Sequence, residues 1–220
     1  MLKVETAGKP TMTEIKLWGF SGSTYVRSVR MLLAEKGVTD YEQIPVDVLK
    51  GEPKAPEHLQ RHPFGKVPVV EVDGFRVIET PAILGYLDAV LPGRTLVPSD
   101  AKAMARSIMV MSIVDSYGYA ALLGGVVAYH LFPDFIGGKN DAMHHKGLED
   151  GKLVITEIMK IRADGPYLAG RDLSLADLYL APIIAYVTMT PHKGEFLGMP
   201  GMQAWWDAVS SLASFKSTQP

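Results

Sequence analysis

The chain has 220 residues, of which 47% are hydrophobic, so it can bury either one sizeable core or two small ones. Its net charge of −2 and its sequence pI of about 6.3 come without any block of like charges, which argues against nucleic acid as a partner. The chain contains no cysteine, and this excludes disulfides, thiolate metal sites and a catalytic protein thiol.

The beginning of the chain resembles an extension more than a targeting signal. Residues 1–13 are polar and show no periodicity, so we expect either an N-terminal extension or a misassigned start, without the apolar core of a signal peptide. No apolar run in the sequence reaches the roughly 20 residues of a membrane span. We therefore expect a cytoplasmic protein with no membrane partner.

Strand and helix signals alternate in the first part of the chain. Residues 14–18 alternate polar and apolar side chains, as a strand does, and a helical apolar spacing then runs up to Gly37, a residue type that often follows the last turn of a helix. Residues 41–46 are typical of a second strand, and residues 56–60 of a short helix. The predicted order up to this point is strand, helix, strand, helix.

A hairpin and a third helix follow. Val69–Val72 and Phe75–Ile78 are β-prone runs joined by Asp73-Gly74, a dipeptide that tolerates positive φ and suits a two-residue turn. Thr80 can then cap a helix with its hydroxyl, and Pro81 occupies a position where a missing N–H costs nothing. The free N–H groups at such a helix start favour anions.

Composition changes after this helix. Residues 91–99 contain Pro, Gly and Arg and interrupt the periodicity, and beyond them strand signals give way to long helical segments. We place a linker at residues 92–99, between a first domain of residues 14–91 and an all-helical domain of residues 100–220.

Two long helices are predicted in the second domain. The first runs from about Asp100 into the 120s and carries two apolar stripes, which imply two packing partners: one stripe faces the core while the other lines a cleft, with plain core packing of both as the alternative. The stripes consist of Met104, Ile108 and Met111, and of Met109, Ile113 and Tyr117. The second helix covers about residues 142–161, after a break at Gly137-Gly138.

Ser174 and Asp177 have the spacing of a capping box, in which each side chain satisfies a free N–H at the other's position. Asp stands here in place of the usual Glu. We assign this pair the structural role of starting a buried helix, and no part in catalysis.

The order loop, Val-Pro, strand, tight turn, strand, Glu-Thr, helix resembles the glutathione-binding half of the glutathione S-transferase family, and residues 63–80 are its most specific part. Tyr167–Leu178 is similar to the folding signature of the family's helical domain. The resemblance extends from about Glu14 to the final helices. It implies an α+β, thioredoxin-like domain of order βαβαββα followed by an all-α domain, with glutathione as co-substrate and a homodimeric assembly.

The same resemblance implies how glutathione is held. Val67 precedes a cis Pro68 and offers its backbone to the cysteinyl part, while Glu79 and Thr80 hold the γ-glutamyl group. Lys54 corresponds to a family residue near the glycyl carboxylate.

Two departures from the family pattern surround this carboxylate subsite and the loop after it. Pro53 replaces the family's His, so the contact with the carboxylate rests on Lys54 and on Lys66. His62 stands where the family commonly has Asn, a change that we expect to affect loop packing more than chemistry.

A free thiol has a pKa near 8.5, and lowering it by two units requires about 2.7 kcal/mol. A hydroxyl that donates a hydrogen bond at the positive end of a helix supplies energy of that order. Ser21, Ser23, Thr24 and Tyr25 are the candidates. The phi-class pattern Ser-Thr-x-Val-x-x-Val matches from Ser23, so we predict Ser23 as the donor to the glutathione sulfur, with Ser21 as runner-up and a simple capping role for Ser23 as the alternative.

A hydrophobic electrophile should bind between the two domains, because ligand clefts favour domain interfaces. The candidate side chains are apolar or aromatic residues from both domains, with plain core packing as the alternative for each. They are Phe20, Met109, Ile113, Tyr117 and Tyr129.

We expect no metal site. His144-His145 with Asp141 is the most suggestive cluster, but adjacent histidines on a helix point about 100° apart and do not readily share an ion.

The function expected from these features is a detoxifying glutathione transferase that stabilises the glutathione thiolate for attack on a hydrophobic electrophile. A glutathione-dependent isomerase of the zeta type is one alternative, although its Ser-Ser-Cys-x-x-Arg motif is not reproduced. A noncatalytic binding or scaffold protein of the same fold is the other.

Overall fold

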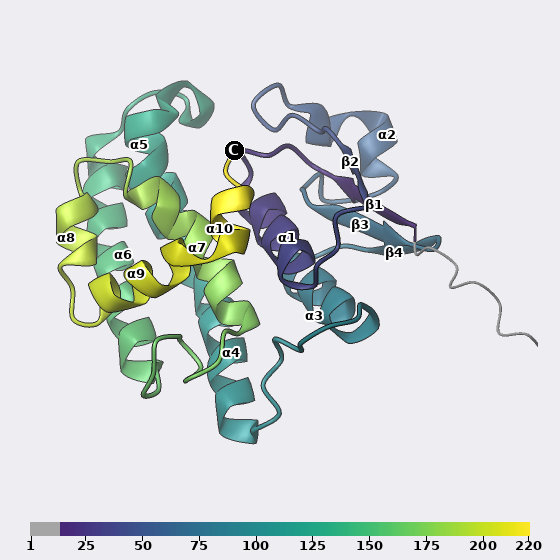
Figure 1. Ribbon diagram of the computed structural model, residues 1–220. Coiled ribbons are helices and arrows are strands. Elements are labelled where there is room, and N and C mark those ends of the chain that lie inside the picture. Colours follow the sequence, from purple (N-terminus) through teal and green to yellow (C-terminus); the bar gives the residue numbers. More distant parts are fainter. Residues whose placement is uncertain (1–13) are drawn as a thin grey trace, which may run out of the picture.

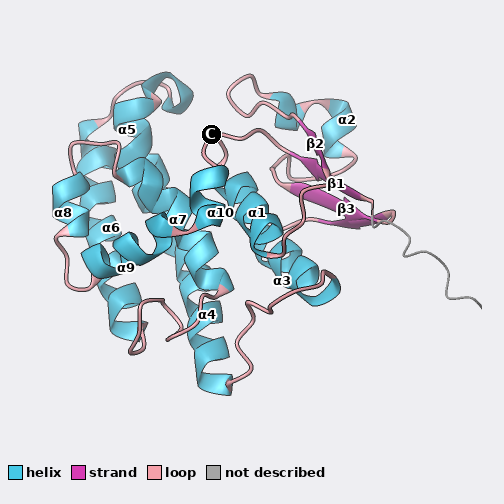
Figure 2. Cartoon of the chain, in the orientation of Figure 1, coloured by secondary structure: helices cyan, strands magenta, loops and turns pink. Residues whose placement is uncertain are grey.

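The computed structural model describes residues 14–220, so the expected extension at residues 1–13 lies outside the described residues. A small domain that contains all the strands of the described chain stands beside a larger domain built from helices (Figure 1). Figure 2 shows the strands gathered at one end of the molecule. This arrangement is the predicted combination of a thioredoxin-like domain and an all-α domain.

The first domain contains a four-stranded mixed sheet of strand order β2-β1-β3-β4. Strand β1 pairs in parallel with β2 and antiparallel with β3, which in turn pairs antiparallel with β4. In the turn between β3 and β4, Asp73 and Gly74 have φ of 48° and 84°, the left-handed values that the predicted hairpin requires. The strands are β1 (Ile15–Trp18), β2 (Glu42–Ile44), β3 (Val69–Val72) and β4 (Phe75–Val77).

Three helices and a short 3-10 turn complete this domain and confirm the order βαβαββα. They are α1 (Thr24–Glu35), η1 (Glu52–Lys54), α2 (Pro56–Leu59) and α3 (Thr80–Val90). The predicted capping role of Thr80 is wrong, because α3 already includes Thr80 and its N-cap is Glu79. Glu79 has φ 68°, so its own backbone turns the chain into the helix and moves Thr80 into the first turn.

The helical domain begins at Ala101, after a linker that includes the predicted residues 92–99. Its elements are α4 (Ala101–Ile113), η2 (Val114–Val127), α5 (Ala128–Leu131), η3 (Pro133–Ile136), α6 (Asp141–Ile161), α7 (Leu175–Val187), α8 (Lys193–Leu197), α9 (Met202–Ser211) and α10 (Ala213–Ser217). α4, η2 and α5 form one continuous helix whose central part, η2, has π-helical hydrogen bonds.

This continuous helix, Ala101–Leu131, is long and apolar enough to cross a bilayer by length and composition alone. Half of its most apolar window is buried inside the fold, however. Such burial is typical of a core helix in a globular protein.

Helix α7 is the centre of the helical domain, and every residue in it except Tyr186 is buried. The predicted capping box between Ser174 and Asp177 is present at its start. Asp177 also accepts hydrogen bonds of 2.9 Å from the Leu168 N–H and from the Trp205 indole N–H. The carboxyl group thus fastens α7 to α9 and to the loop before α7, as its structural assignment predicted.

Candidate active site

A cleft of about 470 Å³ lies between the two domains. The first domain contributes the loop after β1, residues near η1, and the loop before β3. The helical domain contributes η2, the segment around η3, and one side chain of α7. Its lining comprises Phe20, Gly22, Ser23, Thr24, Val48, Leu49, Gly51, Pro53, Lys54, Gly65, Lys66, Val67, Tyr119, Leu123, Gly124, Ala128, Phe132, Phe135, Ile136 and Tyr186.

Ser23 lies in this cleft at the N-terminus of α1. Its backbone is extended, and its Oγ accepts a hydrogen bond of 3.4 Å from the Val26 N–H, so Ser23 is the N-cap of the helix. A hydroxyl that accepts through a lone pair keeps its hydrogen for donation. The predicted catalytic role and the alternative capping role are therefore compatible, because the same oxygen caps α1 and can donate into the cleft.

The other hydroxyls of this loop are less well placed. Ser21 lies outside the cleft lining, where its Oγ is 3.5 Å from the Gln43 Nε2 that donates to it. The hydroxyl of Tyr25 donates to Asp115 Oδ1 at 2.7 Å, and burial, together with nearby Tyr179 and Asp115, raises the pKa of Tyr25. Thr24 does line the cleft, and its Oγ1 is buried without a hydrogen-bond partner among residues 14–220. The geometry favours Ser23 over Ser21.

Three of the residues expected to bind glutathione line the cleft, namely Lys54, Lys66 and Val67. Lys54 Nζ donates to the Phe64 carbonyl at 3.0 Å, which holds this exposed side chain beside the loop before β3. The Val67–Pro68 peptide bond is cis, as the family resemblance implied. The side chains of Lys54 and Lys66 and the residue before the cis bond, Val67, therefore face the same space as Ser23.

Glu79 and Thr80 lie at the start of α3, outside the residues that line the cleft. The Glu79 side chain is 64% exposed, and one of its carboxylate oxygens is 3.9 Å from Nε2 of buried His62. Burial lowers the pKa of His62 despite the nearby Glu79 carboxylate. The expected γ-glutamyl subsite thus combines an accessible carboxylate with the free N–H groups of a helix start.

Of the five side chains predicted to contact the electrophile, the structure brings only Phe20 to this cleft. Ile113 and Tyr117 line a separate hollow between η2 and α6. Met109 is exposed on α4, and Tyr129 donates to Asp141 at 2.6 Å on the outer side of the helical domain.

The apolar wall of the cleft comes instead from later residues. It includes Leu123, Ala128, Phe132, Phe135 and Ile136. The predicted stripes assume the three- and four-residue spacing of an α-helix. From Val114 onward the helix is a π-helix, whose hydrogen bonds span five residues. A different face of the helix therefore meets the cleft beyond Val114. The aromatic segment after α5, just before Gly137-Gly138, was the one sequence signal that could have revealed this wall.

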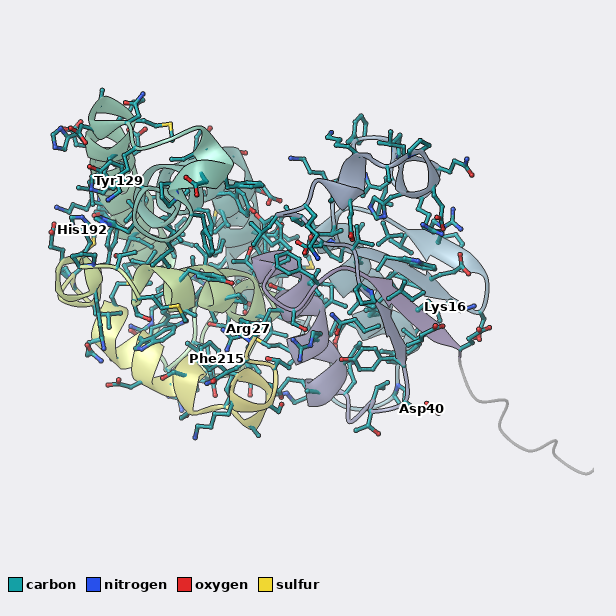
Figure 3. The ribbon with its side chains drawn as sticks, turned by 90° about the horizontal axis from the view of Figure 1, so that it is seen from above. Lys16, Arg27, Asp40, Tyr129, His192 and Phe215 are labelled. Carbon is teal, nitrogen blue, oxygen red and sulfur yellow. The ribbon has the colours of Figure 1, made fainter. Side chains whose placement is uncertain are left out.

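Tyr186 is a further residue that the sequence did not single out. From α7 it donates a hydrogen bond of 2.7 Å to the Gly22 carbonyl, directly before Ser23. Burial raises the pKa of Tyr186, so its hydroxyl stays protonated. A second link lies nearby, where Arg27 of α1 donates to the Phe215 carbonyl at 2.9 Å and stacks on its ring (Figure 3). The helical domain thus holds the start of α1 in place.

Comparison with known proteins agrees with this architecture. The model of the glutathione S-transferase N-terminal domain matches residues 13–89, and that of the C-terminal domain matches residues 125–213. The chain belongs to the glutathione S-transferase family. Glutathione S-transferase 3 of Zea mays is 32% identical over 212 residues, with 94% of each chain covered.

Solved structures of this family have the same fold. A glutathione transferase of Populus trichocarpa superposes with a TM-score of 0.79 at 27% identity, covering 93% of this chain and 97% of that one. A glutathione S-transferase-I solved with the ligand lactoylglutathione also gives a TM-score of 0.79 at 27% identity, covering 93% and 98%.

Proposed function

We propose that this glutathione S-transferase binds glutathione in the cleft between its domains and stabilises the thiolate with a hydrogen bond from Ser23. The observation that carries the proposal is the position of the Ser23 hydroxyl, which caps α1 and faces the same cleft as Lys54, Lys66 and Val67. The N-terminus of α1 adds a favourable electrostatic field for an anion.

The chemistry follows from that position. The thiol releases its proton to solvent, and the electron pair on sulfur forms a new C–S bond with the electrophile. In a substitution the leaving group departs with its bonding pair, and in an addition the product takes up a proton. Lowering the thiol pKa by about two units corresponds to about 2.7 kcal/mol, which a charge-assisted hydrogen bond and a helix terminus together supply.

The apolar part of the cleft lining suits a hydrophobic electrophile. Phe20 of the first domain and Leu123, Phe132 and Phe135 of the helical domain give the cleft an apolar, partly aromatic surface. Such surfaces bind apolar ligands with little specificity, which fits a detoxifying role. We also infer a cytoplasmic location, a compartment whose thiols are kept reduced by glutathione.

We further infer that the enzyme is a homodimer. Phe64, in the loop before β3, is 65% exposed, and a hollow lined by Ile113, Tyr117, Leu153 and other largely apolar residues lies between η2 and α6. In a dimer with two-fold symmetry, Phe64 of each subunit would insert into the hollow of the other subunit. The same contact would therefore form twice and would bury Phe64 and the hollow in both subunits. Phe64→Ser should shift the sedimentation coefficient to that of a monomer. Met189→Ser alters another exposed apolar residue and, as the control, should leave the dimer intact. A Phe64→Ser variant that remains a dimer would contradict this interface.

Steady-state kinetics with glutathione and an activated aryl halide test the catalytic proposal. We expect conjugation well above the uncatalysed rate and a loss of about 10²-fold in kcat/KM for Ser23→Ala, the usual effect of removing one transition-state hydrogen-bond donor. Ser21→Ala is the matched control and should stay near the wild-type value. If glutathione binds without conjugation of any electrophile in a broad panel, the noncatalytic binding function is the better description.

A further inference from the structure

Three histidines from separate segments meet at the outer end of the helical domain, away from the cleft. They are His130 of α5, His144 of α6 and His192, the residue before α8. Their ring centroids form a nearly equilateral triangle with sides of 4.9, 5.1 and 5.2 Å. One ring nitrogen from each lies within 4.8 Å of the other two. In Figure 3, His192 and Tyr129, the neighbour of His130, lie together at the far end from the sheet.

Hydrogen bonds orient two of these rings. His144 Nδ1 is 3.0 Å from the Gly125 carbonyl, and His192 Nδ1 is 2.8 Å from Glu195 Oε1. Both partners are acceptors, so each Nδ1 carries the hydrogen, and in the neutral rings each Nε2 presents a lone pair. The two Nε2 atoms face each other at 3.2 Å. Two lone pairs do not form a hydrogen bond, so a cation or an added proton has to lie between them.

The third ring, that of His130, also has a nitrogen that needs a partner. Nε2 of His130 is buried and has no hydrogen-bond partner among residues 14–220. A single proton between His144 and His192 would leave this nitrogen unsatisfied, at a cost of about 1–3 kcal/mol. A metal ion bound by all three rings satisfies the Nε2 atoms of His130, His144 and His192 at once.

The spacing fits a first-row transition metal. Imidazole nitrogens bind zinc at about 2.0–2.1 Å, so two ligands of a tetrahedral ion lie about 3.3 Å apart and their ring centroids about 5 Å apart. The 3.2 Å between Nε2 of His144 and Nε2 of His192, and the 4.9–5.2 Å between the three ring centroids, agree with these values. Imidazole is a preferred ligand of zinc, copper and nickel. His130 and His192 are only partly buried, which leaves a fourth position for water.

Neighbouring groups orient the histidine rings by hydrogen bonds to their second nitrogens, as in many metal sites. A carbonyl and a carboxylate accept from the two Nδ1 atoms, and Glu195 is itself held by Lys152 at 2.6 Å. The Tyr129 ring stacks on His144 with centroids 4.2 Å apart. Lys139, over the Tyr129 ring, is a nearby positive charge that opposes the ion and limits its affinity.

We propose that His130, His144 and His192 bind a divalent transition metal ion, with zinc as the probe of choice, and that the ion joins α5, α6 and α8. Its role is to stabilise the outer end of the helical domain. The nearby glycines allow this junction, because a Cβ on Gly125 would lie 2.6 Å from the Gly147 Cα, so η2 and α6 approach closely enough for His144 to reach the Gly125 carbonyl.

Calorimetric titration of the chelator-treated protein with zinc, without glutathione because its thiol also binds zinc, tests the site. We expect one equivalent per chain and a rise in melting temperature with zinc concentration. His130→Ala and His192→Ala should each weaken binding at least 10–100-fold, and Glu195→Gln about 10-fold. His145→Ala changes an exposed neighbour of His144 and is the matched control, with unchanged affinity.

Cobalt provides an independent readout. The cobalt-loaded protein should show the intense visible absorption of a tetrahedral ion, and His192→Ala should lose it while its circular dichroism stays that of the wild type. The proposal is overturned by the absence of saturable binding of one equivalent, or by a His145→Ala variant that loses as much affinity as His192→Ala.

Discussion

The two halves of the cleft are built in different ways. On the glutathione side, neighbours in the sequence remain neighbours in space, as in the loop that carries Ser23 and the segment that carries Lys66 and Val67. On the helical side, the wall draws on η2, the segment after α5, and Tyr186 of α7. Short sequence motifs therefore predict the first half of the cleft. The second half depends on which faces of the long helices pack against one another.

The largest effect should come from breaking the buried ion pair that fastens the first domain to the linker leading into the helical domain. Lys36 Nζ and Asp88 Oδ1 form an ion pair of 2.8 Å, with side chains only 1% and 2% exposed. Asp88 also accepts from the N–H groups of Leu96 and Val97 in the linker. Asp88→Asn leaves the Lys36 charge buried without its partner and should lower the free energy of unfolding by about 3–5 kcal/mol.

Denaturant unfolding measures this loss. The double variant Lys36→Met/Asp88→Leu removes both charges and should lose less stability than Asp88→Asn does alone. Equal losses would mean that the linker contacts, and not the ion pair, carry the effect.

The contribution of the Lys36–Asp88 ion pair to stability should depend on pH. Burial raises the pKa of Asp88, but hydrogen bonds from Lys36, Thr95, Leu96 and Val97 outweigh it and bring the pKa below 3.8. A folded-state pKa below the unfolded value means that the stabilisation is complete above the unfolded pKa and is lost as pH falls through the folded pKa. Wild type should therefore lose stability more steeply than Asp88→Asn below about pH 4.

On the glutathione side, Lys54→Ala should raise the KM for glutathione about 10-fold with little change in kcat, because a hydrogen bond to a charged group contributes about 1.5–3 kcal/mol. Lys50→Ala, which alters an exposed lysine outside the cleft lining, is the control. An unchanged KM would assign the glycyl carboxylate to Lys66 or to the backbone.

The smallest effect should come from the link across the cleft. Tyr186→Phe removes the hydrogen bond to the Gly22 carbonyl and should cost about 1 kcal/mol of stability. We expect this bond to position the loop before Ser23 without contacting glutathione, so kcat should fall several-fold with KM unchanged. Tyr129→Phe, remote from the cleft, should keep the wild-type kcat; a rise in KM for Tyr186→Phe would instead point to direct glutathione contact.

Local signals predicted most of the first domain. The turn at Asp73-Gly74 needs positive φ and the capping box at Ser174 needs only its own helix, so both could be read from the sequence. The position of Ser23 also followed from a local pattern. The start of α3 was misplaced by one residue, because the unusual backbone of Glu79 leaves no mark in composition.

Tertiary contacts escaped prediction. Four of the five predicted electrophile contacts lie outside the cleft lining, and the π-helical hydrogen bonds of η2 account only for those that follow Val114, namely Tyr117 and Tyr129. The sequence pattern drew attention to His144 and its neighbour His145, whose ring centroids are 6.2 Å apart. The residues that do meet His144 are His130 and His192, which lie 14 and 48 positions away in the sequence. The spacing of residues along one helix carries no information about contacts between side chains of different helices.

The ultraviolet absorbance of bound glutathione thiolate, followed across pH, tests the role of Ser23 most directly. Wild type and Ser21→Ala should form thiolate with a pKa about two units below the free value of about 8.5, and Ser23→Ala should return it toward that value while glutathione still binds. An unchanged thiolate pKa in Ser23→Ala would contradict the assignment and move the donor to another group in the cleft, with Thr24, which follows Ser23 and also lines the cleft, as the next candidate.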